Sequence, residues 1–436
     1  MKRSFFSLLL FALFAIAGMA QMKFSFNGIV TTEEVLADGS TLIKFPSGTD
    51  LNALGDKMTV TIGGNTVSDL SAITPNPATT LITDWEIETF VYEGKAYSFR
   101  FAGDEYFTAV IFSDPHVEQT NYGGLTVANE QIFVNNIVKL GKTGGKMLSF
   151  TKVPVIPTAD IVFCLGDMDA DNEKTGTNFT NAFNGFNTAQ IPFITMAGNH
   201  DLVPDYWTGD DPDKGLTWGI NDGGSYCNDK ALSIISNQRT KAAGYGGFTV
   251  DVIKDTDFAG DVQIEPFAFT FKGVRFYCGQ TYWFQKPYKK PLLGTATYYA
   301  PDGVIEALEA DAEKNKDVPA VWMQHYPFVY GSDCDRWWVD QNDKGLFIKP
   351  TDTSAYITSD LIYTSNNPDA KTKKDKLASI IKKTKNPIHF SGHVHSNATN
   401  TYNGITDMTI GQPGNVYLVL CKKGVGVVEV VTANLY

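Results

Sequence analysis

The sequence predicts a layered α/β domain preceded by a small all-β module. From Tyr106 onward, apolar strand-like runs alternate with helix-like stretches, a rhythm typical of α/β folds with substantial parallel pairing. Before about Gly103, the pattern contains strands and turns alone. The 436 residues are enough for about two or three domain-sized units. A hydrophobic content of 43% and a charged content of 19% are ordinary for a globular protein.

The first twenty residues have the composition of a cleavable secretory signal peptide. Lys2 and Arg3 form a basic start, residues 5–16 are apolar, and small residues follow up to Ala20. The apolar stretch is short for a membrane span, which needs about 20 apolar residues. We therefore expect cleavage after Ala20, a periplasmic or secreted protein, and no stable membrane insertion after cleavage.

Residues 22–103 form the predicted N-terminal β module. Val60 and Ile62 alternate with threonines, and Trp85, Ile87 and Thr89 alternate with acidic residues, which is typical of half-buried strands. The module contains neither histidine nor cysteine. We therefore expect it to pack, position or bind rather than to catalyse.

Residues 104–436 are assigned to the α/β domain. The predicted strands lie at 107–112, 161–165, 191–196, 320–323 and 388–390, with more strands within 416–431. The predicted helices lie near 127–140, 179–188, 302–314 and 371–383. Long insertions near 202–266 and 328–368 follow strands that carry polar motifs, so we expect these insertions to line a functional site.

Five short motifs contain five of the six histidines. They are FSDPH (Asp114, His116), CLGDMD (Asp167), MAGNHD (Asn199, His200, Asp201), MQHYP (His325) and FSGHVH (His393, His395). Each motif follows a predicted strand, and functional groups of open α/β sheets gather where strands end. Imidazole, carboxylate and amide ligands without thiolate suit Zn, Mn or Fe. The sequence therefore predicts a pair of metal sites at one edge of a sheet.

The ordered set D-x-H, G-D, G-N-H-D, H and G-H-x-H resembles the calcineurin-like metallophosphoesterase superfamily, which includes purple acid phosphatases and cyclic-nucleotide phosphodiesterases. The motifs run from Asp114 to His395, most of the chain, and leave the N-terminal module outside. The resemblance implies a layered β-sandwich flanked by helices. It also implies an exported two-metal phosphoric-ester hydrolase, in which a metal-bridged hydroxide attacks the phosphorus of a phosphomonoester or small phosphodiester.

The resemblance also implies a role for each motif residue. Three ligands would hold a first metal ion, namely Asp114, His116 and His395. Three would hold a second, namely Asn199, His325 and His393. Asp167 would bridge both ions. His200 would stabilise the transition state or donate a proton, and Asp201 would orient it.

One position departs from the purple acid phosphatases, which have an iron-binding tyrosine three residues after the bridging aspartate. Here that position is Ala170. We therefore expect two divalent ions of Mn, Zn or Fe rather than a ferric–tyrosinate centre.

The expected partner is a small phosphate ester. A formal charge of −12 argues against a nucleic-acid polymer, whose binding needs a cationic surface. The sequence leaves the choice between monoester and diester open, and also the oligomeric state. The alternative function is a catalytically silent metal- or ligand-binding protein on the same fold.

Two predictions concern residues outside the motifs. His389 is expected to be a hydrogen-bonded core histidine. Cys164 is expected to be a small buried hydrophobe, and one disulfide could form among Cys227, Cys278 and Cys334, with the pair left open.

Overall fold

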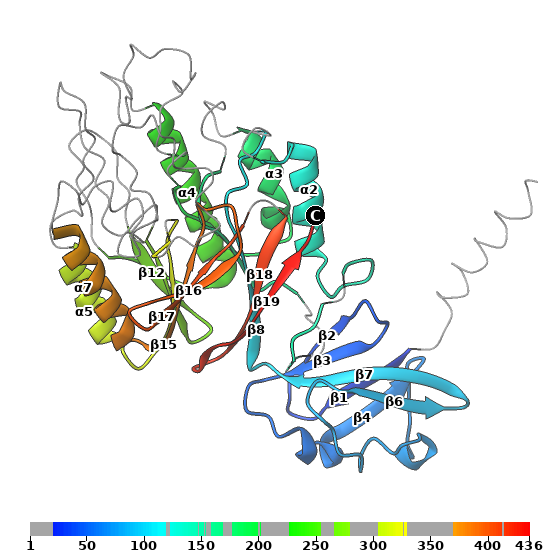
Figure 1. The fold of residues 1–436 in the computed structure, drawn as a ribbon. Coiled ribbons are helices and arrows are strands. Elements are labelled where there is room, and N and C mark those ends of the chain that lie inside the picture. The colour runs from blue at the N-terminus through cyan, green and yellow to red at the C-terminus, as the bar shows by residue number, and fades with distance from the viewer. Residues whose placement is uncertain are drawn as a thin grey trace, which may run out of the picture. The chain divides into compact units, whose positions relative to one another are not determined.

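The computed structural model describes residues 21–118, 123–146, 148–151, 153, 158–168, 177–198, 201, 226–253, 266–279, 304–325, 327–328, 369–411 and 414–436, with backbone alone for 226–233 and 369–374. The chain divides into two compact units (Figure 1). The first takes in the chain up to Glu105 together with residues 141–157, and the second takes in residues 106–140 and 158–436. The predicted signal peptide lies outside the described residues. No helix within those ranges combines the length and apolar character that a membrane crossing requires.

The first unit contains two sheets around an aromatic core. One sheet has the order β1 (Met22–Phe26), β4 (Met58–Ile62), β5 (Asn65–Thr66), and the other has the order β2 (Thr32–Val35), β3 (Thr41–Phe45), β7 (Lys95–Gly103), β6 (Ile87–Tyr92). Three short 3-10 helices connect strands, η1 (Leu51–Ala53), η2 (Gly55–Lys57) and η3 (Leu70–Ala72). Alternate residues of β1 point inward, and the Phe24 ring meets Phe99 edge-on at 4.7 Å. Residues 141–157 join this unit through Ala37, whose N–H donates to Gly141 O at 2.8 Å.

The second unit contains a five-stranded and a seven-stranded sheet. The first has the order β10 (Phe193–Thr195), β9 (Ile161–Cys164), β8 (Tyr106–Phe112), β18 (Asn415–Lys422), β19 (Gly426–Asn434). The second has the order β11 (Val250–Val252), β12 (Phe267–Phe271), β13 (Val274–Cys278), β14 (Pro319–Met323), β15 (Lys385–Ser391), β17 (Ile405–Thr409), β16 (Ala398–Tyr402). Pairing is parallel across β8–β9–β10 and across β13–β14–β15–β17, as the strand–helix alternation predicts.

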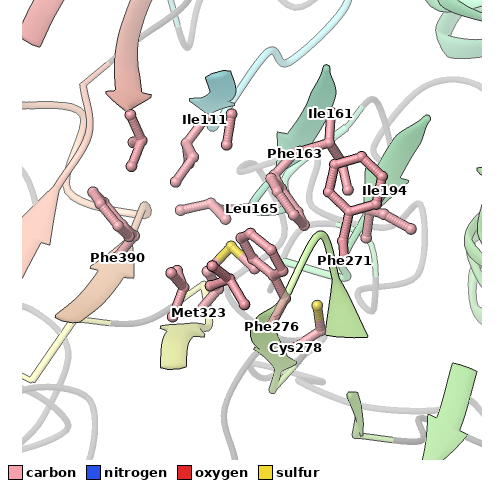
Figure 2. Packing of buried hydrophobic residues seen from close by; sticks show 14 of the residues in the cluster. Ile111, Ile161, Phe163, Leu165, Ile194, Phe271, Phe276, Cys278, Met323 and Phe390 are labelled. Atoms are coloured by element: carbon pink, nitrogen blue, oxygen red, sulfur yellow. The ribbon is translucent and has the colours of Figure 1, made fainter. Parts of the chain in front are cut away.

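The two sheets face each other across the main core of this unit. Figure 2 shows Ile111 and Phe163 of one sheet together with Phe276, Met323 and Phe390 of the other. The Phe163 and Phe276 rings stack with centroids 5.1 Å apart. Strands β9 and β14 are apolar and buried on both faces, because helices cover the outer faces of the sheets as well.

Two helices cover the outer face of each sheet. They are α2 (Val127–Val138) and α3 (Thr177–Thr188) on the five-stranded sheet, and α5 (Val304–Lys314) and α7 (Asp369–Lys383) on the seven-stranded sheet. Phe112 contacts Phe133 of α2 and Phe183 of α3, with ring centroids 5.3 and 5.4 Å away. On the other side, Trp322 shares a core with Leu308 of α5 and with α7. The order of layers is helix, sheet, sheet, helix, so the predicted mixed α/β fold is confirmed.

Helix α4 (Tyr226–Gly246) lies inside the insertion assigned to 202–266, where no helix was predicted. Its buried residues include Ile235, Gln238 and Ala242, which follow helical spacing. Gln238 interrupts the apolar stripe, and glycines lie near the helix end. The usual signal of an amphipathic helix is therefore weak here.

Candidate metal centre

Six of the seven predicted metal ligands converge in the second unit. The first group is Asp114, His116, Asp167 and His395, and the second group is Asp167, His325 and His393. Within each group, one donor atom from every residue lies within 4.8 Å of the others. Asp167 belongs to both groups. The remaining predicted ligand, Asn199, and the predicted proton donor, His200, lie outside the described residues.

Both sheets contribute to this cluster. Asp114 and His116 follow β8, Asp167 follows β9, His325 follows β14, and His393 with His395 follow β15. Backbone bonds continue beyond the strand ends, since Asp114 N donates to Gly166 O at 3.0 Å and Gly392 N donates to His325 O at 2.8 Å. His393 N donates to Asp114 Oδ2 at 2.9 Å and so joins the two sheets.

The first group has the spacing of ligands around one ion. His116 Nε2 lies 3.1 Å from His395 Nε2, and His395 Nε2 lies 3.3 Å from Asp114 Oδ1. His116 Nε2 lies 3.7 Å from Asp167 Oδ2. Ligands about 2.1 Å from a shared ion stand about 3.0–3.4 Å apart. Asp114 Oδ1 is buried and has no hydrogen-bond partner among the described residues, as expected of an oxygen that binds a cation.

In the second group, His325 and Asp167 are so close that a positive charge between them is required. His325 Nδ1 lies 3.0 Å from the carbonyl oxygen of Leu165, which can only accept, so this nitrogen carries the proton. In the neutral imidazole, the lone pair of Nε2 then faces Asp167 Oδ2, at 3.2 Å. An imidazole lone pair and a carboxylate at this distance repel each other unless a proton or a metal ion lies between them. The donor set therefore fits a divalent transition metal.

Five residues of the cluster adopt the left-handed backbone region, which is unfavourable for residues other than glycine. The φ angles are 53° for Asp114, 40° for His116, 54° for Asp167, 71° for His393 and 53° for His395. Each such residue costs of order 1–3 kcal/mol and persists where surrounding structure holds it. This concentration of strain in one cluster indicates a functional site.

Two motif glycines allow the loops to approach each other. A Cβ on Gly198 would collide with Asp167 Oδ1 and with the Asp167 backbone nitrogen. A Cβ on Gly392 would collide with Ser113 Oγ and lie 2.7 Å from Asp114 Oδ2. Close packing therefore requires a glycine at each of these two positions.

Asp201 holds two of the loops together. Its Oδ1 accepts from Met168 N at 2.9 Å, and its Oδ2 accepts from Gly198 N at 2.7 Å. Burial and the charge of Asp167 raise the pKa of this carboxyl to about 8, although the two donors favour its ionised form. Both oxygens are therefore engaged in joining the ends of β9 and β10.

The two histidines of the second group have opposite protonation tendencies. Burial lowers the pKa of His325, but the charge of Asp167 and the hydrogen bond to it outweigh burial and raise the pKa to about 9. Burial and the charge of His325 hold the pKa of His393 well below its usual value. Burial also opposes ionisation of Asp114, yet the contact with His395 and the charge of His325 lower the pKa of its carboxyl. The cluster thus attracts one positive charge and keeps a neutral imidazole beside it.

Residues outside the motifs also contribute buried polar groups. His389 Nδ1 lies 2.8 Å from Asp407 Oδ1, which confirms the prediction of a hydrogen-bonded core histidine. Asp407 and Glu130 are also buried, and neither could be singled out from the sequence, because neither belongs to a motif.

The described cysteines are free. Cys164 is fully buried, as expected, and its thiol donates to Gly166 O. Cys278 is also a buried free thiol. The Cys227 side chain and Cys334 lie outside the described residues, so their pairing stays a prediction.

Comparisons with known proteins found only distant likeness. No family model matches the chain, and no curated protein does. One solved structure that aligns with it is assigned as a 5'-nucleotidase from Staphylococcus aureus in complex with alpha-ketoglutarate, at 10% identity and a TM-score of 0.36. The alignment covers 76% of this chain and 54% of that one, so this chain spans about half its length. Another is a phosphopantetheinyl hydrolase from Mycobacterium tuberculosis, at 13% identity and a TM-score of 0.31, with 70% and 90% covered. Such scores support no inference about activity, which must come from the site.

Proposed function

We propose that this chain is an exported two-metal hydrolase that cleaves a phosphomonoester or a small phosphodiester. The observation that carries the proposal is the pair of groups that share Asp167. The ordered motifs and the helix–sheet–sheet–helix layering support a member of the calcineurin-like metallophosphoesterases. Residues 1–20 support export.

The proposed centre would hold one ion with Asp114, His116 and His395, and another with Asn199, His325 and His393. Asp167 would serve both. Divalent Mn, Zn or Fe would supply Lewis acidity, which brings the pKa of water toward about 7 at such sites. The two carboxylates neutralise only part of the charge of two divalent ions. The centre would therefore attract a phosphate oxyanion despite the net charge of −12.

The residues of the chain have separate tasks in this proposal. The carbonyl of Leu165 fixes the tautomer of His325, so that Nε2 faces the ligand group. Asp201 holds the loops after β9 and β10. His200, the residue before Asp201, would donate a proton to the leaving oxygen. Proton donation of this kind contributes about 10²- to 10⁴-fold to a rate.

The test is hydrolysis of nitrophenyl phosphate and of bis(nitrophenyl) phosphate by the purified chain, after loading with Mn, Zn or Fe. We expect metal-dependent turnover of at least one ester, and the preferred ester decides between monoesterase and diesterase. His200→Ala should lower kcat by about 10²- to 10⁴-fold. Asp311→Asn is the control, because Asp311 pairs with Arg275 away from the cluster.

Two results would contradict the proposal. Turnover of neither ester by a metal-loaded chain would favour the catalytically silent binding protein. Equal activity of His200→Ala and the parent would remove His200 from the chemistry.

A further inference from the structure

A buried carboxylate on β17, that of Asp407, contacts residues close in sequence to the histidines of the second group. Asp407 is 0% exposed. Strand β17 runs parallel to β15, and their register places Asp407 beside His389. Burying a carboxylate is costly unless hydrogen-bond donors surround it. The hydrogen-bond donors around Asp407 therefore indicate which parts of the chain this carboxylate holds in place.

Among the described residues, three donors from two segments of the chain reach this carboxylate. Asp407 Oδ1 accepts from Ser391 Oγ at 2.9 Å and from His389 Nδ1 at 2.8 Å, which must carry the proton because a carboxylate only accepts. Asp407 Oδ2 accepts from the backbone N–H of Phe328 at 2.7 Å. The Phe328 ring also packs on the His389 ring, with centroids 4.5 Å apart.

These contacts join the two loops that carry His325 and His393. Ser391 comes two residues before His393, and Phe328 comes three residues after His325. A direct backbone bond, from Gly392 N to His325 O at 2.8 Å, joins the same loops closer to the cluster. One carboxylate thus contacts both segments, at Phe328 and at Ser391.

An uncharged residue could not replace this arrangement. An asparagine has one acceptor oxygen, and its NH₂ group would face either Phe328 N or the pair of donors on the other side. At least one buried donor would lose its acceptor, and the loop that it belongs to would be free to shift. A displacement of a loop that carries metal ligands lowers the affinity of the site for the metal ion.

We propose that Asp407 is a positioning residue that holds His325 and His393 at the separation needed to bind one metal ion together with Asp167. The inference rests on the proposed metal centre and adds to it a residue that no motif marks. It assigns Asp407 no contact with substrate or metal. Its effect should be larger on the affinity of the second group, because His325 and His393 both lie on the loops that Asp407 contacts, whereas only His395 of the first group does.

The test is calorimetric titration of the metal-free, full-length chain with Zn²⁺ or Mn²⁺. The parent should bind two ions. Asp407→Asn should bind one of them about 10- to 100-fold more weakly, the range for partners that orient metal ligands, and the other with a smaller change, because only His395 of the first group lies on a loop that Asp407 contacts. Ser391→Ala removes a single donor and should give a smaller weakening of the same ion, which covers the case in which Asp407→Asn does not fold.

Asp311→Asn is the matched control. Asp311, on helix α5, accepts from Arg275 of β13 at 2.7 and 2.8 Å, and β13 belongs to the same sheet as β15 and β17, so the loss of this carboxylate tests general destabilisation. It should lower the melting temperature and leave both metal affinities as in the parent. Equal affinities in the parent, Asp407→Asn and Ser391→Ala would overturn the proposal. Equal weakening by Asp311→Asn and Asp407→Asn would overturn it too.

The same titration separates this inference from the proposed function. If the parent binds no ion, the proposed function and the proposed role of Asp407 are both refuted. If the parent binds two ions but hydrolyses no ester, the proposed hydrolase activity is refuted. The role of Asp407 is then decided by the measured metal affinities alone.

Discussion

Glu130 on α2 gives the stability of the second unit a specific pH dependence. The side chain is 0% exposed, and neither carboxylate oxygen has a hydrogen-bond partner among the described residues. Burial raises the pKa of this carboxyl from 4.5 to about 8. At pH values well below 4.5 the carboxyl is protonated in both the folded and the unfolded chain, so its ionisation contributes nothing to the free energy of unfolding there.

Above pH 4.5 the unfolded chain releases a proton that the folded chain keeps. The free energy of unfolding should therefore fall by about 1.4 kcal/mol per pH unit up to pH 8, where the full cost, of order 5 kcal/mol, is reached. Glu130→Met replaces the carboxyl by an apolar group of similar size and removes this cost. The variant should gain about 4 kcal/mol over the parent between pH 5 and pH 8.

Urea unfolding of the parent and of Glu130→Met at pH 5 and pH 8 measures this gain. Gln131→Met is the control, since Gln131 is the next residue of α2, is exposed and does not titrate. It should leave the pH dependence of the parent unchanged. The reasoning would be refuted if Glu130→Met kept that pH dependence as well, because the carboxyl would then titrate alike in the folded and unfolded chain.

Three further predictions concern the candidate centre. Gly198→Ala should abolish metal binding while α2 and the sheets stay folded, because the added Cβ collides with Asp167. Circular dichroism would report the fold and metal analysis the bound ions. Full metal content in this variant would contradict the prediction. Asp201→Ala should lower the free energy of unfolding by about 3 kcal/mol, since two buried donors, Met168 N and Gly198 N, lose their acceptor. A loss below 1 kcal/mol in urea would show that these bonds add little. Removal of metal with a chelator should lower the melting temperature, and readdition of the ion should restore it; an unchanged melting temperature would argue against a bound ion.

Much of the second unit follows from its sequence, for local reasons. Strands β8 and β9 are continuous apolar runs because both of their faces are covered, and such runs between helix-like stretches are typical of a layered α/β domain. Helix α4 was missed because a buried glutamine, Gln238, interrupts its apolar stripe. The pairing of β15 with β17 joins segments whose order in the sheet depends on the whole fold, and no local pattern indicates it.

Some residues of the candidate site could also be predicted from the sequence, and others could not. His116 and His395 could be predicted because each lies in a short motif after a strand. Asp407 could not be predicted, because it is a single aspartate in an ordinary strand, and its importance depends on contacts with Phe328 and Ser391 from other segments. The role of Asp201 also became more specific, since both of its oxygens hold backbone N–H groups.

The shared position of Asp167 allows the most direct test of the proposed centre. Metal analysis of the purified parent, after loading and removal of free ions, should find two divalent ions per chain. Asp167→Ala should lose both, because Asp167 belongs to both groups of ligand candidates. Two ions retained by Asp167→Ala, or none bound by the parent, would contradict the account.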